Sequence, residues 1–368
     1  MGQHPAIMKK AGGMKTRGRT APLGWVGLIL AVLILPIALS GAALVGGATL
    51  DRLLHPDRHA ASGSRMLSPA LFVDRVRPVL TPGARVAALT LAGPGEAVVV
   101  ATTAPVTGAR GTDYYLDPST GHRLAVAGHD AGPVAVLERL HHGLGLGSAG
   151  RVIVGALGLA LMLSCLTGLY VGWPHGGGWR QVLRHWHRRG RLAAGHHLLG
   201  LVSVGPLFLL ALTGTWLAMP APFARLAGAP PRLRSEPSAL ARPMARPAQP
   251  LAVVLGRAAD LHPNAVVRTI LWPTERDPDW TVYFADARIA PVKVADDTGS
   301  ATAVSAHPLD MPAAGVLDLH GGRGLGAMWR GVLIVTGLSS AAVTITGLIL
   351  WRRTRRRPKD QAVAGIDR

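Results

Sequence analysis

Four apolar stretches of the chain are each long enough to cross a bilayer core, which takes about 20 helical residues. They run from about Leu23 to Ala48, from Val152 to Trp173, from about His196 to Met219 and from Gly331 to Trp351. The first stretch is longer than the apolar core of a signal peptide, and no clear small-residue cleavage site precedes Asp51, so we interpret it as a retained helix. The pattern predicts an α-helical membrane protein with four transmembrane helices, in contact with the lipid bilayer.

Basic side chains predict the orientation of these helices. They cluster in the N-terminal segment 1–22, in the loop 175–195 and in the tail 352–368. With four spans, the three segments lie on one side of the membrane, and the positive-inside rule makes that side cytoplasmic. We therefore expect a multi-pass protein of the bacterial inner (cytoplasmic) membrane with both termini in the cytoplasm.

The formal net charge of +19 follows from these clusters. A nucleic-acid-binding protein would carry its basic residues as a patch on a folded surface, whereas here they flank apolar runs, so we expect no nucleic-acid partner. Cys165 is the only cysteine, which excludes a disulfide framework and a CxxCH site for covalent haem. The sequence contains no phosphate-binding loop, GxSxG elbow, HExxH motif or flavin fingerprint, so nothing indicates a hydrolase or an ATPase.

The segments 51–140 and 220–318 lie on the opposite side and predict two small α+β domains. Each combines one short helix with strand-like runs, and a Pro-, Ala- and Arg-rich linker at about 228–249 precedes the second. The expected helices are Ala70–Leu80 and Leu251–Leu261, and the expected strands are Arg85–Leu91, Ala97–Thr102, Tyr114–Leu116, Val266–Trp272, Trp280–Ala285 and Val292–Val294. The run from Asp117 to Gly121 lacks the spaced carboxylates of a calcium loop, so it predicts a turn.

An internal repeat relates the two halves of the chain. The second helix with its lead-in (141–174) aligns without a gap on the fourth with its lead-in (319–351), and His141 meets His320 at an offset of 179 residues. The first helix, 23–50, aligns on the third, 196–219. The chain is therefore a duplicated two-helix unit, in which each unit contains a helix, a soluble domain and a second helix.

Histidines at equivalent repeat positions are the candidates for chemistry. His141 and His320 each precede a Gly-rich run, and two neutral imidazoles from facing helices can ligate a haem iron from both sides. Arg151 and Arg330, ten residues further on, could pair with haem propionates. On a straight helix His141 would stand roughly 15 Å beyond Arg151, so this interpretation requires a bend in the Gly-rich run or a haem at the surface. The alternative is a polar lead-in followed by snorkelling arginines.

Further histidines lie on the cytoplasmic side. His196 and His197 open the third helix, where they are candidates for a second haem or a proton-linked role, the alternative being an interfacial anchor. His175, His185 and His187 fall in the basic loop and indicate a segment that faces lipid headgroups. The Ser-Gly and Thr-Gly steps within the helices are interpreted as sites of close helix packing.

In combination, these motifs resemble the PepSY-associated transmembrane family, known for iron-regulated membrane proteins and ferric-siderophore reductases. The residues similar to the family's second helix are Leu140-His141, Arg151, and Thr167-Gly168-Leu169-Tyr170 through Trp173-Pro174. Those similar to its fourth helix are Leu319-His320-Gly321 and Thr346-Gly347 through Trp351, and Tyr115–Gly121 resembles a PepSY turn. The resemblance covers roughly residues 20–355 and implies that both soluble domains are PepSY-like.

The resemblance also implies a cofactor. Helix-end histidines of the family bind b-type haem, which points to His141 and His320 for an outer haem and to His196 for an inner one. The inner partner would lie four residues before Gly27, where this chain has Leu23, and leucine cannot ligate iron. We therefore expect one or two b haems: either another histidine such as His197 or His175 replaces the missing ligand, or the inner haem is absent.

The expected function is a haem-b-binding inner-membrane protein that resembles ferric-siderophore reductases. It would pass electrons from a membrane or cytoplasmic donor to a periplasmic ferric siderophore or similar chelate. The alternative is a non-enzymatic membrane anchor whose soluble domains bind a peptide, a protease or an envelope partner. A transporter of a metal chelate ranks last, because it would need polar side chains at the membrane midplane and these helices have few beyond Ser and Thr.

Overall fold

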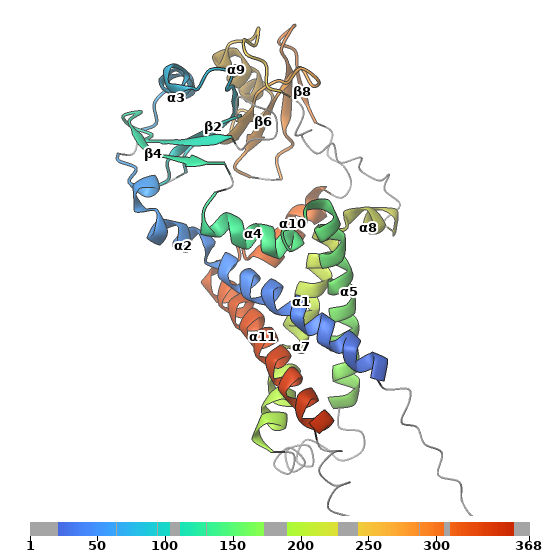
Figure 1. Ribbon diagram of the computed structural model, residues 1–368. Coiled ribbons are helices and arrows are strands. Elements are labelled where there is room, and N and C mark those ends of the chain that lie inside the picture. Colours follow the sequence, from blue (N-terminus) through green and yellow to red (C-terminus); the bar gives the residue numbers. More distant parts are fainter. Residues whose placement is uncertain are drawn as a thin grey trace, which may run out of the picture.

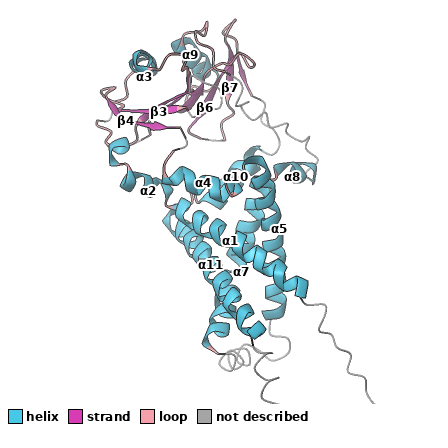
Figure 2. Cartoon of the chain, viewed as in Figure 1, coloured by secondary structure: helices cyan, strands magenta, loops and turns pink. Residues whose placement is uncertain are grey.

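The computed structural model shows a bundle of long helices, a β-sheet beyond one end of it, and short helices between the two (Figure 1). It describes residues 21–63, 65–93, 95–103, 111–129, 131–172, 190–226, 242–286, 288–304 and 310–356. Figure 2 shows the strands gathered at one end of the molecule, so the elements fall into a helical and a sheet-containing part. The basic clusters at 1–20, 175–189 and 357–368 lie outside the described residues.

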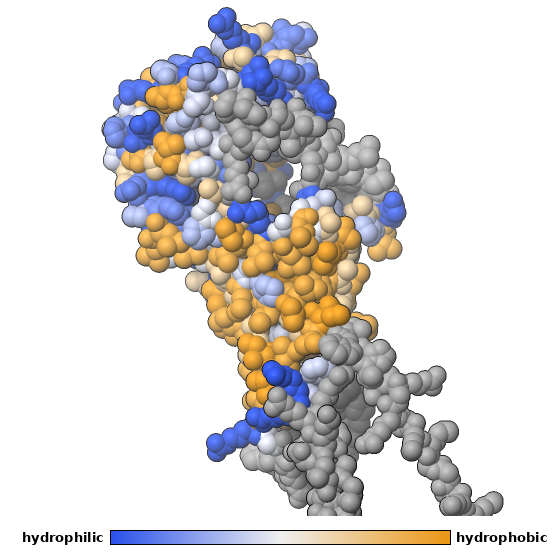
Figure 3. Space-filling view, viewed as in Figure 1, coloured by the Kyte–Doolittle hydropathy of each residue, from blue (hydrophilic) through white to orange (hydrophobic). Residues whose placement is uncertain are grey.

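Four helices of the described chain are long and apolar enough to cross a membrane, as the sequence predicts. They are α1 (Ala21–Val45), α5 (Gly147–Gly172), α7 (Arg191–Ala218) and α11 (Gly326–Arg356). The apolar spans within them are Leu28–Val45, Gly147–Tyr170, Arg191–Ala218 and Gly326–Arg353. Apolar residues cover the surface of the bundle in Figure 3. Helices with this surface are stable in lipid and not in water, so the chain is a membrane protein.

Helix packing follows the internal repeat. α1 packs against α11, and α7 packs against α5 in the equivalent way. A Cβ added at Gly337 of α11 would lie only 2.9 Å from Cβ of Ala42 in α1. The equivalent residue of α5, Gly158, packs against Ala211 and Thr215 of α7. Glycine allows both pairs of helices to approach closely, which is the main source of attraction between helices in lipid.

A sharp bend separates each histidine-bearing helix from the membrane helix that follows it. α4 (Pro133–Gly143) ends before Leu144 and Gly145, whose φ angles are 52° and 74°. In the second half, α10 (Asp310–Gly321) ends before Gly322 and Gly324, whose φ angles are 72° and 70°. Left-handed backbone of this kind ends a helix and turns the chain. α4 and α10 therefore lie across the end of the bundle (Figure 1), and this is the bend that the haem interpretation requires.

The two soluble segments, predicted as two small α+β domains, are joined in one continuous sheet. The strands are β1 (Val86–Thr90), β2 (Val98–Thr102), β3 (Thr112–Leu116), β4 (Arg123–Gly128), β5 (Val267–Leu271), β6 (Asp279–Phe284), β7 (Val292–Ala295) and β8 (Ala301–Ala303). Their order in the sheet is β4-β3-β2-β1-β5-β6-β7-β8. The two units join where β1 pairs antiparallel with β5. Apart, each unit would expose one of these strands as an edge, and pairing satisfies the backbone groups of both.

The joint between the two units is symmetric. Thr90 of β1 lies opposite Thr269 of β5, and their hydroxyl oxygens are 3.3 Å apart. The two threonines are separated by 179 residues, which is the offset of the internal repeat. A pseudo-two-fold axis therefore passes between them, and the duplication read in the sequence is also a symmetry of the fold.

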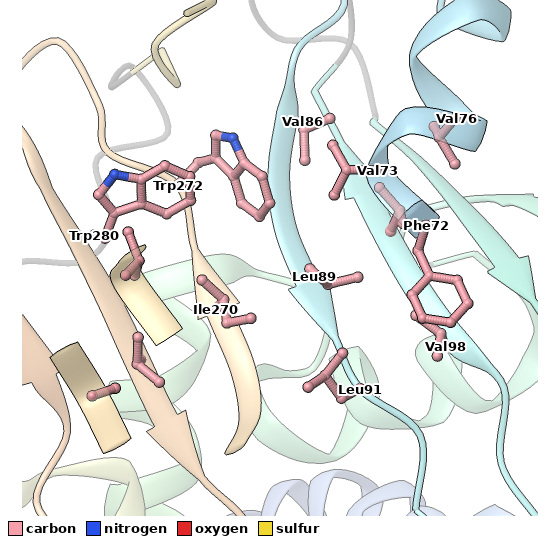
Figure 4. Close-up of a cluster of buried hydrophobic side chains, with 14 of the residues drawn as sticks. Phe72, Val73, Val76, Val86, Leu89, Leu91, Val98, Ile270, Trp272 and Trp280 are labelled. Carbon is pink, nitrogen blue, oxygen red and sulfur yellow. The ribbon is translucent and has the colours of Figure 1, made fainter. Parts of the chain in front are cut away.

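A single apolar core lies on one face of the sheet. α3 (Pro69–Val76) and α9 (Leu251–Leu261) pack on this face, and Phe72 and Val254 from these two helices are fully buried. Figure 4 shows apolar side chains of both units in one cluster, where the rings of Trp272 and Trp280 are 4.8 Å apart. The two units therefore share one apolar core.

The helix predicted at 251–261 is confirmed, while the one predicted at 70–80 ends earlier. Its last residues form a 3-10 turn, η2 (Arg77–Val79), because Pro78 has no N–H to continue the helix. β4 and β8 escaped prediction, since both are edge strands with much exposed surface and carry little alternation of polar and apolar residues.

Short elements connect the bundle to the sheet. α2 (Gly47–Leu54) and η1 (Pro56–His59) follow α1, and α8 (Pro220–Leu226) follows α7. The Asp51 carboxylate accepts hydrogen bonds from His55 and His59, at 3.0 and 2.8 Å. The guanidinium of Arg58 lies 5.1 Å from the ring centre of Tyr115 in β3, so this connector also contacts the sheet.

The residues from Asp117 to Gly121 form a turn, as predicted. The buried Asp117 carboxylate accepts hydrogen bonds from the backbone and hydroxyl of Ser62 at 2.9 and 2.6 Å, and from the backbone of Ser119 and Thr120 at 2.7 and 3.0 Å. Burial raises the pKa of Asp117, but the hydrogen bonds outweigh it and lower the pKa to about 2. The ionised carboxylate thus holds the segment around Ser62 against the turn.

We predict that Asp117→Asn destabilises the sheet in a pH-dependent way. Because the folded-state pKa lies below the ordinary value, the ionised carboxylate contributes roughly 2 kcal/mol above about pH 4, and this contribution is lost as the pH falls towards about 2. In thermal unfolding of the purified protein, the variant should melt below the wild type near neutral pH, and the gap should close in acid. Asp57→Asn, at an exposed position, is the control. A gap independent of pH would contradict this prediction.

Candidate functional site

His141 and His320 meet at the end of the bundle nearest the sheet. His141 belongs to α4 and His320 to α10, and their ring centres are 6.1 Å apart with ring planes inclined by 43°. The two histidines are 179 residues apart, which is also the separation of Thr90 and Thr269, so both pairs are related by the same internal repeat. One imidazole from each half of the chain therefore contributes to a single site.

α1 positions the ring of His141. Nδ1 lies 2.9 Å from the carbonyl oxygen of Ile37 and 3.4 Å from the hydroxyl of Ser40. The ring rests against Gly41, where an added Cβ would come within 2.6 Å of Cε1. Any residue larger than glycine would push the imidazole away from α1.

α7 positions the ring of His320 in a similar way. Nδ1 lies 2.9 Å from the hydroxyl of Thr213, which itself donates to the carbonyl of Leu209 at 2.8 Å. A Cβ added at Gly214 would lie 3.0 Å from Cε1 of His320. A hydroxyl residue and the glycine after it thus hold the imidazole in both halves.

These contacts fix the tautomer of both rings. A carbonyl oxygen only accepts hydrogen bonds, so Nδ1 of His141 must carry the proton that Ile37 accepts. His320 likewise donates to the backbone of Leu210, which is the repeat equivalent of Ile37, and the Thr213 hydroxyl beside its Nδ1 donates within its own helix. Burial lowers the pKa of His141, and burial together with the nearby His141 ring lowers the pKa of His320 to about 4. Both rings are therefore neutral at pH 7, with Nε2 as the basic nitrogen.

The separation of the rings suits two axial ligands of one metal. An imidazole–metal bond is about 2 Å long and the nitrogen lies about 1.1 Å from the ring centre, so rings on opposite sides of one metal have centres roughly 6 Å apart. Ligating histidines typically donate their other N–H to a protein acceptor, as both rings do here. Within the described residues, no three His, Cys, Asp or Glu side chains gather as a metal site, but a haem iron needs only two protein ligands. The donor set fits a haem.

Arg151 and Arg330 lie in the first turns of α5 and α11, next to the bends. A Cβ added at Gly322 would come within 2.9 Å of Cγ of Arg330, and one at Gly143 would lie 3.4 Å from the backbone nitrogen of Arg151. The bends thus bring each arginine's backbone or stem close to the end of a histidine-bearing helix. Pairing with haem propionates stays a prediction.

His196 has the same kind of contacts at the opposite end of the bundle. Its Nδ1 lies 2.9 Å from the hydroxyl of Thr346, which donates to the carbonyl of Ala342 at 2.7 Å. A Cβ added at Gly347 would lie 3.3 Å from Cε1 of His196. Along α7, this contact is about 25 Å from the Thr213 level, at 1.5 Å per residue. We call such a hydroxyl residue, with the glycine after it, an imidazole seat; Ser40-Gly41, Thr213-Gly214 and Thr346-Gly347 are imidazole seats.

The structure leaves the other predicted cytoplasmic ligands undecided. The ring of His197 lies 5.7 Å from that of His196, next to it on the same helix. Leu23 belongs to α1, but its side chain lies outside the described residues, as do His175, His185 and His187. Leucine offers no lone pair in any conformation, so position 23 supplies no ligand.

The imidazole seats were missed as site residues by the sequence interpretation, which assigned the Ser-Gly and Thr-Gly steps to helix packing. Packing is the role of Thr336-Gly337, where Gly337 contacts α1, but not of the three imidazole seats. The signal that could have found them is the repeat itself, because Ser40-Gly41 aligns with Thr213-Gly214 just as His141 aligns with His320.

Comparison with known proteins now adds the family. Residues 24–354 match the family described as the PepSY-associated TM region, which is most of the chain. The chain belongs to this family. Among curated proteins, none matches the chain. The PepSY-associated family fits the four apolar helices, and it confirms the resemblance that the helix-end motifs indicate.

Proposed function

We propose that this protein binds one b-type haem between His141 and His320. The observation that carries the proposal is the pair of neutral imidazoles, 6.1 Å apart, that come from equivalent positions of the two halves. Each ring is anchored through Nδ1, so Nε2 is the nitrogen available to an iron. Neutral, oriented imidazoles need no proton release and little reorganisation to bind a metal.

The proposed activity is electron transfer to a ferric chelate on the sheet side of the membrane. When held by His141 and His320, a haem would supply one-electron chemistry, and the proposed acceptor of each electron is one ferric ion of a chelate. A membrane or cytoplasmic reductant would supply that electron. Support comes from membership of the PepSY-associated family and from the location of the histidine pair, at the end of the bundle nearest the sheet.

The residues of the chain would have separate tasks in this activity. His141 and His320 would hold the iron, while Ile37 and Thr213 keep both rings in the Nδ1–H form. Burial and the nearby His141 ring lower the pKa of His320 to about 4, so this imidazole is neutral near pH 7. A siderophore is the proposed class of chelate.

A second, inner haem is not part of the proposal. His196 is seated on Thr346-Gly347, but the equivalent residue of the first half is Leu23. A single imidazole binds haem iron much less firmly than a pair, since only one axial bond forms. We expect a haem content near one per chain.

The proposed location is the bacterial inner membrane, with both termini in the cytoplasm and the sheet outside it. The basic clusters that flank the spans support this orientation. Cys165, the only cysteine, is buried in α5, so a Cys165→Ser background allows single-cysteine labelling. We predict that Ala60→Cys reacts with an impermeant maleimide in intact spheroplasts, and that Lys359→Cys reacts only after lysis. The reverse pattern would refute the orientation.

We predict a reduced-minus-oxidised b-type spectrum from the purified protein. His141→Ala or His320→Ala should lower the haem content at least about 10-fold, because each removes one of two axial ligands. His122→Ala, at an exposed position of the sheet, is the matched control and should keep the full spectrum. A natively folded preparation that takes up no haem when reconstituted would refute haem binding and favour the anchored, non-enzymatic alternative.

A further inference from the structure

The three seated histidines share one local geometry. In each case a serine or threonine on a membrane helix lies next to the imidazole Nδ1, and the following glycine lies under Cε1. His141 and His320 share it at one end of the bundle, and His196 repeats it at the other. The same geometry occurs between different pairs of helices. It is therefore a property of the hydroxyl-glycine sequence and not of one particular helix contact.

The hydroxyl is directed towards the imidazole by the helix that carries it. Ser40, Thr213 and Thr346 donate to the carbonyl of the residue four positions earlier, at 2.7, 2.8 and 2.7 Å. Once its proton is used within its own helix, the oxygen can only accept. The nearby imidazole must then present N–H at Nδ1, and the missing Cβ of the glycine lets the ring lie against the backbone.

A fourth step with the same sequence lies on α5. Thr167-Gly168 is equivalent to Thr346-Gly347 at the repeat offset of 179. The Thr167 hydroxyl donates to the carbonyl of Leu163 at 2.9 Å, as in the imidazole seats. Among the described residues, nothing lies within 4 Å of a Cβ built at Gly168, and Thr167 is exposed. The hydroxyl and the glycine are therefore present without a described imidazole.

We propose that the imidazole seats are positioning elements for the histidines that would hold the haem. Thr167-Gly168 is not counted among them, because no described imidazole lies against it. The inference rests on the proposed haem function, and it adds which residues orient the ligands.

The first test changes the seat of His320 and leaves the ligand in place. Thr213→Val should remove the hydroxyl beside Nδ1, leave only the backbone of Leu210 as a partner, and weaken haem affinity about 10-fold or more, as loss of an outer-shell partner typically does. Thr213→Ser restores a hydroxyl and should keep affinity near the wild type. Thr336→Val is the matched control, because Thr336 is buried and donates to Val332 in the same way, but its glycine contacts α1.

The glycine of the seat is tested in parallel. Gly214→Ala should displace the His320 ring and weaken haem binding, because the new Cβ would lie 3.0 Å from Cε1. Gly205→Ala, on the same helix, meets nothing within 4 Å and should have no effect. Equal behaviour of the seat variants and their controls would overturn the positioning role.

A readout without haem separates this inference from the proposed function. Imidazole ¹⁵N NMR of haem-free protein labelled at histidine should report His320 as the Nδ1–H tautomer, and Thr213→Val should shift the Nδ1 resonance because the neighbouring hydroxyl is lost. If the wild type binds no haem, the proposed function fails while this measurement still decides the seat. If haem binds but the Nδ1 resonance does not respond to Thr213→Val, only the positioning role fails.

Discussion

The arrangement depends on the pairing of two equivalent halves around one pseudo-two-fold axis. In the sheet, Thr90 meets Thr269 and closes the edges of two four-stranded units. At the end of the bundle, His141 meets His320. A duplicated chain can place two copies of one residue in contact only near its symmetry axis, so each of these pairs marks the axis. A single histidine in an ancestral unit would thus become a two-ligand site by duplication and pairing alone.

The structural features around His141 and His320 bring the two rings together. The left-handed residues after α4 and α10 turn these helices across the bundle, so that the rings do not project away from the membrane. The shared apolar core and the β1–β5 joint hold the two soluble units together on the same side. The seats then orient the rings, and burial keeps them uncharged. Metal affinity gains most from ligands whose orientation is fixed before binding.

Much of this could be predicted from the sequence, for identifiable reasons. Long apolar runs indicate membrane helices directly. The repeat offset of 179 residues pairs His141 with His320 from the sequence alone. On a straight helix His141 and Arg151 would be too far apart to share a haem, so the haem interpretation predicts a bend between them. The Gly-rich run that separates them allows such a bend. The single sheet could not be predicted, because nothing local in β1 or β5 distinguishes an edge that pairs with its own repeat from one that stays exposed. The imidazole seats were assigned to helix packing because both roles use a serine or threonine followed by glycine. Thr213-Gly214 and Thr336-Gly337 differ only in what they contact in the folded chain, which is His320 for the first and α1 for the second.

The account reduces to the claim that two imidazoles, one from each half, bind the same iron atom. At the far end of the bundle, His196 is seated and its repeat equivalent in the sequence is Leu23, so the claim concerns one site near the sheet. Low-temperature EPR of the oxidised protein tests it most directly, because the ferric spin state reports the number of strong axial ligands. The account predicts one low-spin ferric signal with the anisotropy of bis-imidazole ligation. A dominant high-spin signal from folded, haem-loaded protein would contradict it.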